Sequence, residues 1–215
     1  MLSHQDTIAA ITTPNGVGAL GLIRVSGPKA IALVDACFSK DLSQAPGHTL
    51  HFGQVLQKEE VLDEVVVSLF RAPKSFTRED TIEISCHGSP YILREILQLL
   101  VNQGCRLAEP GEFTQRAYLN GAMDLAQAEA IADLIASQSH QSHKLAMNQL
   151  RGGVSTELKA LRQQLLDFTS LIELELDFGE EDVEFADRSQ LKALVNQIEA
   201  KLSSLINSFQ LGNAL

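Results

Sequence analysis

The sequence predicts an α+β domain with a largely antiparallel sheet, followed by an α-helical domain. Up to about residue 120, apolar alternating stretches and amphipathic stretches follow the order strand, strand, helix, hairpin, strand, helix, strand. Beyond residue 121, apolar residues recur almost throughout at helical spacing. A strand-rich segment followed by a helical one is typical of two folding units. We therefore expect one domain at residues 1–120 and the first part of a helical domain at 121–215.

Composition and charge narrow the class of protein. Of the 215 residues, 45% are hydrophobic and 20% are charged, which is typical of a globular protein rather than a disordered one. A formal net charge of -10 argues against broad nucleic-acid binding through this region. The sequence contains no signal-peptide pattern and no apolar run long enough to cross a membrane. We expect a cytoplasmic protein in which Cys37, Cys86 and Cys105, which lack metal-ligand spacing, are buried free thiols.

The first two strands are expected at Thr7–Thr12 and Leu20–Val25, with a glycine-rich loop between them. Residues 16–21 match G-x-G-x-x-G, the spacing of a dinucleotide-binding turn. That turn must open a helix, whereas these glycines lead into a strand rich in branched residues. We interpret the loop as a place where the backbone approaches another segment closely.

Two charged residues fall inside predicted strands. Arg24 lies in the second strand, where it must be paired or exposed, or must contact an anion or carbonyl in a cleft, because burying a bare charge is costly. In Thr81–Cys86, strict alternation places Glu83 on the face opposite Ile82 and Ile84.

The other elements of the first domain follow from turn residues and apolar faces. The polar loop Ala72–Asp80 precedes a strand and could cover the mouth of a site. His87, at a strand-to-helix turn, is expected to be a local hydrogen-bond partner. The remaining predictions are a helix after Pro28, a hairpin of Leu50–Gln57 with Val61–Phe70, a helix from Pro90 to Val101, and a strand at Cys105–Ala108.

Helix signals dominate from residue 110 onward. Thr114 is expected to cap a short helix through Tyr118, and Asp124 with Gln127 forms an approximate capping box for the next helix. Gly152–Gly153 predicts a helix break, and Asp187 or Ser189 can cap the last helix. The acidic stretch 173–187 is interpreted as a solvated loop, with a divalent-metal site as the alternative.

Four motifs together resemble the tRNA modification GTPase family MnmE, also called TrmE. They are DTIAA at residues 6–10, the glycine-rich loop into LIRVSG, SFTREDTIEISCHGSP, and AEPGEFTQRAYLNGAMDLAQAEAIADLI. The last two are long and specific, and the similarity extends from near residue 5 to the last residue.

The resemblance implies a fold and an incomplete set of domains. The first domain would be a tetrahydrofolate-binding domain like that of aminomethyltransferases. The family inserts a Ras-like GTPase domain, which binds GTP with Mg and K ions, into the helical domain. This sequence stops where that insertion would begin, has no G-x-x-x-x-G-K-[ST] loop and lacks the family's C-terminal cysteine motif. We therefore expect no GTP hydrolysis by this region alone.

The resemblance also implies a function and partners. Family members work with MnmG (GidA), a flavoprotein, to add a carboxymethylaminomethyl-type group at C5 of the wobble uridine in tRNA. The one-carbon unit comes from a tetrahydrofolate derivative, in its 5-formyl or methylene form. The N-terminal domain forms a homodimer and binds the folate near the dimer interface. No membrane partner is implied.

By position, Arg24 and Glu83 match the family's folate contacts. A carboxylate can accept the paired N–H donors of a pterin, and an Arg fork suits a carbonyl or carboxylate. A third contact falls on Ala122, where many members have Lys. No catalytic residue or metal ligand is assigned to this region.

Two other functions are compatible with the same residues. One is a stand-alone folate-dependent methyl-group transferase, with Asp80 or His87 as the first acid–base candidates. The other is a dimerisation scaffold without folate binding, which the loss of a basic residue at Ala122 would favour.

Overall fold

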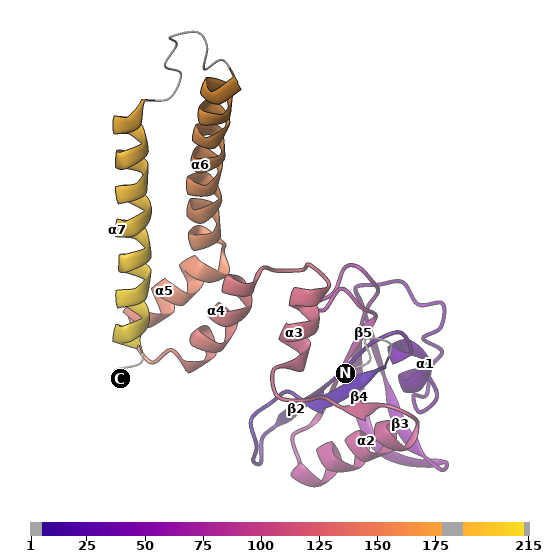
Figure 1. Cartoon of the computed structure of the whole chain (residues 1–215). Coiled ribbons are helices and arrows are strands. Elements are labelled where there is room, and N and C mark those ends of the chain that lie inside the picture. Colours follow the sequence, from indigo (N-terminus) through magenta and orange to yellow (C-terminus); the bar gives the residue numbers. More distant parts are fainter. Residues whose placement is uncertain (1–5, 178–186, 213–215) are drawn as a thin grey trace. The chain divides into compact units, whose positions relative to one another are not determined.

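The computed structural model of the chain describes residues 6–177 and 187–212. It forms two compact units, Met1–Met123 and Asp124–Leu215 (Figure 1). The boundary falls immediately before Asp124, the residue that caps the first helix of the second unit.

The first unit is built on a six-stranded sheet with the order β3-β4-β5-β2-β1-β6. Every neighbouring pair is antiparallel except β1 with β6. The predicted α+β fold with a mostly antiparallel sheet is therefore confirmed. The strands are β1 (Ile8–Ile11), β2 (Leu20–Ser26), β3 (Thr49–Gln57), β4 (Glu60–Phe70), β5 (Thr81–His87) and β6 (Arg106–Leu107).

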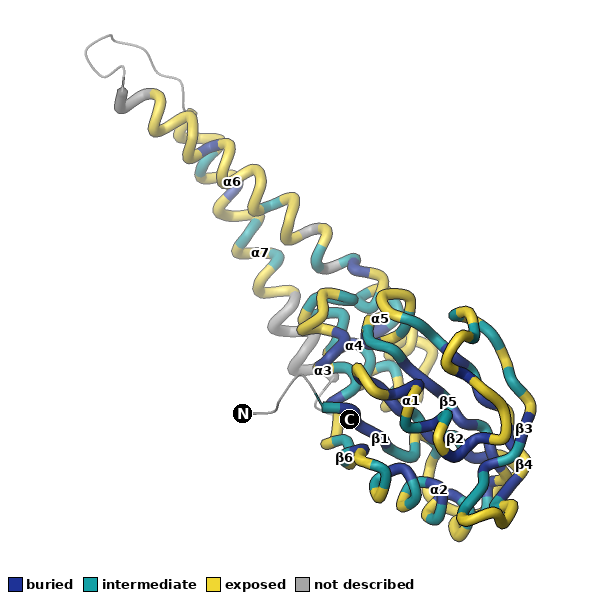
Figure 2. Tube along the Cα trace, turned by 90° about the vertical axis from the view of Figure 1, so that its right-hand side faces the viewer, coloured by how far each residue is buried: buried dark blue, intermediate teal, exposed yellow. Residues whose placement is uncertain are grey.

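One face of this sheet forms the hydrophobic core. Alternate strand residues such as Ile23, Val25, Ile82 and Ile84 are fully buried (Figure 2). Helices α1 (Ala30–Asp35) and α2 (Pro90–Asn102) supply apolar residues to the same core. Burying each large aliphatic side chain contributes about 1.5–3 kcal/mol. Since side chains alternate along a strand, Arg24 and Glu83 project from the opposite face.

The glycine-rich loop approaches the turn after β5. The Gly18 N–H donates to the Gly88 carbonyl at 2.9 Å, and a Cβ on Gly88 would lie only 2.4 Å from the Gly18 oxygen. The loop leads into β2 rather than a helix. The predicted close backbone approach is confirmed, and a helix-opening dinucleotide turn is excluded here.

Helix α3 (Glu112–Leu119) begins before the predicted cap, so the prediction for Thr114 is wrong. Gly111 occupies the N-cap position with φ 78°, a left-handed conformation that glycine adopts without strain. The Glu112 carboxylate accepts the Glu109 N–H at 2.8 Å. Thr114 therefore lies within the first turn. Gly111 and the Glu112 carboxylate take the place of the Thr cap that was predicted at the start of the helix.

The second unit contains four helices in its described residues: α4 (Leu125–Ala136), α5 (His140–Leu150), α6 (Gly153–Asp177) and α7 (Arg188–Gly212). The predicted break at Gly152–Gly153 is confirmed, with Gly152 at φ 79°. At the start of α7, the Asp187 carboxylate accepts the Ser189 N–H at 2.7 Å.

No helix in the described ranges is long and apolar enough to cross a membrane.

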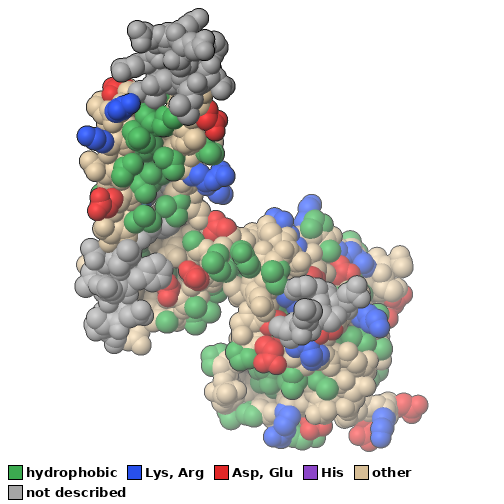
Figure 3. Space-filling view, viewed as in Figure 1, with side chains coloured by type: hydrophobic (Ala, Val, Ile, Leu, Met, Phe, Trp, Pro, Cys, Tyr) green, Lys and Arg blue, Asp and Glu red, His purple; other side chains and the backbone are tan. Residues whose placement is uncertain are grey.

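The pair of long helices α6 and α7 has a small core. Phe168 and Leu194 are buried together, with Leu161, Leu191 and Ile198 partly buried around them. An apolar band remains at the surface of this pair (Figure 3). The large apolar side chains of these two helices that are at least 36% exposed are Leu158, Leu165, Leu166, Leu171, Ile172, Leu174, Val195 and Leu202.

The capping box of α4 is confirmed. Asp124 accepts the Gln127 N–H at 3.0 Å, and the Gln127 side chain accepts the Asp124 N–H at the same distance. Replacing Asp124 with Ala should lower the unfolding free energy of the second unit by about 0.5–2 kcal/mol. Denaturant unfolding followed by circular dichroism measures this, with Asp133→Ala on the exposed side of α4 as the control. Equal effects of the two substitutions would contradict a capping role for Asp124.

Candidate functional site

Arg24 and Glu83 form a cross-strand pair on the sheet face away from the core. They are directly opposed in the β2–β5 ladder. Arg24 Nε and Nη2 both donate to one carboxylate oxygen, Oε1 of Glu83, at 2.9 and 2.7 Å. The side chains are 22% and 23% exposed, so a ligand can reach them from solvent.

This ion pair leaves hydrogen-bonding groups available. Within the described residues, neither Oε2 of Glu83 nor Nη1 of Arg24 makes a hydrogen bond. The site therefore presents a carboxylate acceptor beside a guanidinium donor. That combination suits the edge of a planar heterocycle that carries N–H donors next to a carbonyl acceptor.

Two aromatic rings flank the Arg24 guanidinium. The Phe76 ring centroid lies 5.0 Å from the Arg24 carbon Cζ, and that of Phe113 lies at 5.5 Å. Phe76 belongs to the 71–80 loop between β4 and β5, and Phe113 belongs to α3. The polar loop predicted to cover the mouth of a site contributes Phe76 to this contact, and its covering role stays a prediction. Cation–π contacts of this kind hold the guanidinium in place and give the site apolar walls.

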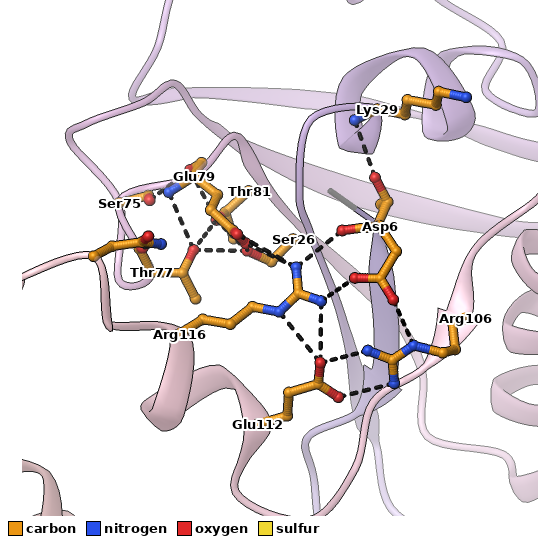
Figure 4. A network of polar contacts seen from close by, with 12 residues as sticks. Asp6, Ser26, Lys29, Ser75, Thr77, Glu79, Thr81, Arg106, Glu112 and Arg116 are labelled. Atoms are coloured by element: carbon orange, nitrogen blue, oxygen red, sulfur yellow. Dashed lines mark hydrogen bonds and ion pairs between the residues drawn. The ribbon is translucent and has the colours of Figure 1, made fainter. Parts of the chain in front are cut away.

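The first unit also contains a buried network of charged side chains (Figure 4). The Arg116 side chain is 3% exposed, and it donates to the Asp6 carbonyl at 2.9 Å and to Glu112 at 3.0 Å. Its contact with Glu79 is longer, at 3.3 Å. Arg106 donates to both Asp6 and Glu112. The guanidinium groups of Arg106 and Arg116 therefore pair with three carboxylates, those of Asp6, Glu79 and Glu112.

The network joins the two segments that carry the aromatic walls. Glu79 lies in the same loop as Phe76, and it also accepts the Ser26 hydroxyl at 2.7 Å. Glu112 and Arg116 lie in α3 with Phe113. Arg116 thus positions the loop and the helix against the same sheet face. Neither Glu112 nor Arg116 was among the predicted site residues, although their i, i+4 spacing in a helix is the sequence signal for such a pair.

The Glu112 carboxyl is held in its charged form. Burial alone would raise its pKa, but hydrogen bonds from Arg106, the Glu109 N–H and Arg116 outweigh burial and lower the pKa to about 2. A depressed folded-state pKa means that the charged form stabilises the fold above the unfolded-state pKa. That stabilisation is lost as the pH falls from about 4.5 to about 2.

Glu112→Gln should therefore destabilise the protein most at neutral pH. The difference in unfolding free energy between wild type and Glu112→Gln should shrink steadily from about pH 4.5 to about pH 2. Denaturant titrations of both proteins across this range provide the measurement. A difference that stays constant with pH would show that the Glu112 charge contributes nothing.

Ala122 lies beyond the C-terminal end of α3, at the opposite end of that helix from Phe113. Its N–H donates to the Ala117 carbonyl at 2.8 Å, and its side chain is half-buried. The structure thus brings Arg24 and Glu83 into direct contact and places Ala122 elsewhere along α3. A methyl group supplies no charge at that position.

The two acid–base candidates of the methyl-transferase alternative have structural partners. His87 Nδ1 lies 2.6 Å from Oδ1 of Asp63, whose other oxygen accepts the His87 N–H at 2.8 Å. This confirms His87 as a local hydrogen-bond partner. Asp80 accepts the Ala72 N–H at 2.9 Å, within the loop that carries Phe76.

The described residues contain no cluster of side chains suited to a metal ion, and their cysteines are buried. No group of three or more His, Cys, Asp or Glu side chains there could hold a metal ion. Part of the acidic stretch, 178–186, lies outside the described residues. Cys37, Cys86 and Cys105 are free and buried, as predicted. Burial raises the pKa of each thiol to about 11, so each stays protonated at neutral pH.

Comparison with known families covers nearly the whole chain. Residues 7–122 match the family described as GTP-binding protein TrmE N-terminus. Residues 125–215 match the family described as MnmE helical domain.

Curated relatives give the same result. A protein named tRNA modification GTPase MnmE from Bacteroides thetaiotaomicron is 60% identical over 217 residues, and one from Cytophaga hutchinsonii is 56% identical over 214. Another from Christiangramia forsetii is 58% identical over 215 residues. The matches cover 98–99% of this chain but only 45–46% of the relatives, so the chain spans about half their length.

Proposed function

The chain belongs to the MnmE family of tRNA modification GTPases, and from this premise we propose that its first unit binds a tetrahydrofolate derivative. The observation that carries the proposal is the Arg24–Glu83 pair between two aromatic rings. Of the three positions that the family resemblance assigns to folate, Arg24 and Glu83 meet there, whereas Ala122 lies beyond the end of α3.

The chemistry of the pair fits the pterin ring of a folate. The free Oε2 of Glu83 can accept from the ring N–H and the neighbouring amino group. The free Nη1 of Arg24 can donate to the ring carbonyl. Phe76 and Phe113 supply apolar walls against which the pterin and its one-carbon group can pack. The site would hold and orient a one-carbon carrier, in the 5-formyl or methylene form, and needs no acid–base pair of its own.

Dimerisation through the first unit is part of the proposal. Leu50 and Phe52 on β3 and Val66 on β4 are 71%, 59% and 36% exposed. By register they lie on the same sheet face as Glu83. Exposed apolar residues that adjoin a candidate site are a typical feature of an interface, and they support a homodimer formed beside the folate.

The intact protein would use this unit in tRNA modification. We propose that it cooperates with the flavoprotein MnmG to add a carboxymethylaminomethyl-type group at C5 of the wobble uridine in tRNA, in the cytoplasm. GTP, Mg and K would be bound by parts of the protein outside these residues. The names of the relatives, which join tRNA modification to GTPase activity, support this role.

Folate titration tests the proposal. The purified chain should bind 5-formyl-tetrahydrofolate saturably in a calorimeter, at one ligand per subunit, with a dimer mass by light scattering. A folded dimer that binds no folate would contradict it and would favour the scaffold alternative, for which the methyl side chain at Ala122 is the supporting observation. Methyl transfer by the isolated chain would instead favour the transferase alternative.

A further inference from the structure

Arg78 has a backbone conformation that disfavours an arginine. Its φ is +60°, in the left-handed region that glycine adopts without cost and other residues adopt rarely. Its side chain is exposed, so burial of the side chain does not compensate for the strain. Residues held in such conformations often serve a function.

The Arg78 guanidinium lies on the turn that follows α3. Nη1 donates to the Asn120 carbonyl at 3.2 Å, and a Cβ on Gly121 would lie 3.4 Å from the same nitrogen. Within the described residues, this is the one hydrogen bond that the side chain makes, and no carboxylate pairs with it. Most of the guanidinium fork therefore remains available to an anion.

The position of Arg78 is tied to the candidate folate site. Phe76, two residues earlier in the loop, packs against Arg24. The Asn120 side chain donates to the Thr77 carbonyl at 2.7 Å, which joins this part of the loop to the end of α3. Phe113 and Asn120 lie about 10 Å apart along the axis of α3. The Arg78 guanidinium therefore lies at the C-terminal end of α3, whereas Phe113, which packs on Arg24 of the Arg24–Glu83 pair, lies at its N-terminal end.

We propose that Arg78 binds a carboxylate of the glutamate tail of the folate. This inference rests on the proposed function and extends it to the acidic end of the ligand. A folate carries its pterin at one end and its carboxylates at the other, with a flat aminobenzoyl group between them. Arg24 and Glu83 address the pterin end, and Arg78 offers a planar fork that matches a carboxylate. Ala122, in the same turn, has only a methyl group and cannot supply this charge.

A purely structural role for Arg78 and a role in ligand binding predict different effects of removing its side chain on the melting temperature and on ligand affinity. If the side chain served only to cap the C-terminal end of α3, its removal would lower the melting temperature and leave ligand affinity unchanged. If it serves the ligand, Arg78→Gly should relieve the left-handed strain and keep or raise the melting temperature. Affinity for a ligand with a carboxylate tail should then fall while stability does not.

The experiment compares two ligands and four proteins by calorimetry. The ligands are 5-formyl-tetrahydrofolate and 5-formyl-tetrahydropterin, which lacks the aminobenzoylglutamate tail. Arg78→Gly should weaken the first about tenfold, because one charge-assisted hydrogen bond is lost, and should leave the second unchanged. Lys74→Ala, an exposed cation in the same loop, is the charge control and should alter neither. Ala122→Lys in the Arg78→Gly background should recover affinity for the folate.

The outcomes separate this inference from the proposed function. Wild-type affinity of Arg78→Gly for 5-formyl-tetrahydrofolate would overturn the role of Arg78 and leave folate binding intact. An equal loss for both ligands would also overturn it, because the effect would not lie at the tail. A wild-type chain that binds neither ligand would contradict folate binding itself, and the role of Arg78 with it.

Discussion

Replacing Arg116 with Met is expected to lower the unfolding free energy of the first unit by about 3–5 kcal/mol. The Arg116 side chain is 3% exposed and donates to the carboxylates of Asp6, Glu79 and Glu112. Without Arg116, only the Arg106 guanidinium of this network is left to pair with Asp6 and Glu112, and the carboxylates stay charged in a largely buried environment. Methionine keeps much of the aliphatic bulk, so the loss reports mainly on charge and hydrogen bonding.

Denaturant unfolding followed by circular dichroism measures this effect. Arg94→Met is the matched control, because Arg94 is an exposed arginine on α2 and exposed substitutions usually change stability by less than about 0.5 kcal/mol. Equal, small effects of the two substitutions would show that the network contributes little to the fold.

Replacing Glu83 with Gln is expected to weaken binding of 5-formyl-tetrahydrofolate about 10- to 100-fold. Gln keeps the shape of Glu but loses the negative charge, and hydrogen bonds to a charged group are worth about 1.5–3 kcal/mol. The substitution removes the negative charge from two interactions. One is the ion pair with Arg24, and the other is the proposed hydrogen bond from the pterin.

Calorimetric titration of the variant provides the test. Glu64→Gln on the adjacent strand β4 is the control, since Glu64 is exposed and its carboxylate accepts a hydrogen bond from the Gln54 side chain. Undiminished folate affinity in Glu83→Gln would remove Glu83 from the site. A loss shared equally by both variants would indicate a general charge effect.

Much of the fold was predictable because it depends on local patterns. Alternation in residues 81–86 fixed which face of β5 is buried, and the branched residues after Gly21 distinguished a strand from a helix. The start of α3 was not predictable from cap preferences. Gly111, with φ 78°, begins that helix and the Glu112 carboxylate accepts the Glu109 N–H, an arrangement that the usual preference for a Ser, Thr, Asp or Asn cap does not describe.

The candidate site was only partly predictable for the same reason. Arg24 and Glu83 are 59 positions apart, and their direct pairing follows from the β2–β5 register. Arg116 and Asp6 are 110 positions apart, so no local pattern joins them. Phe76 and Phe113 have no sequence signature that separates a wall of a binding site from an ordinary apolar residue. Side-chain contacts between distant segments assemble the site.

A crystal structure of the chain with 5-formyl-tetrahydrofolate tests the central claim most directly. We expect the pterin to lie beside Phe76 and Phe113, with its N–H edge on the Glu83 carboxylate and its carbonyl near Arg24. A folate bound at another place, with the Arg24–Glu83 pair unchanged and untouched, would contradict the account.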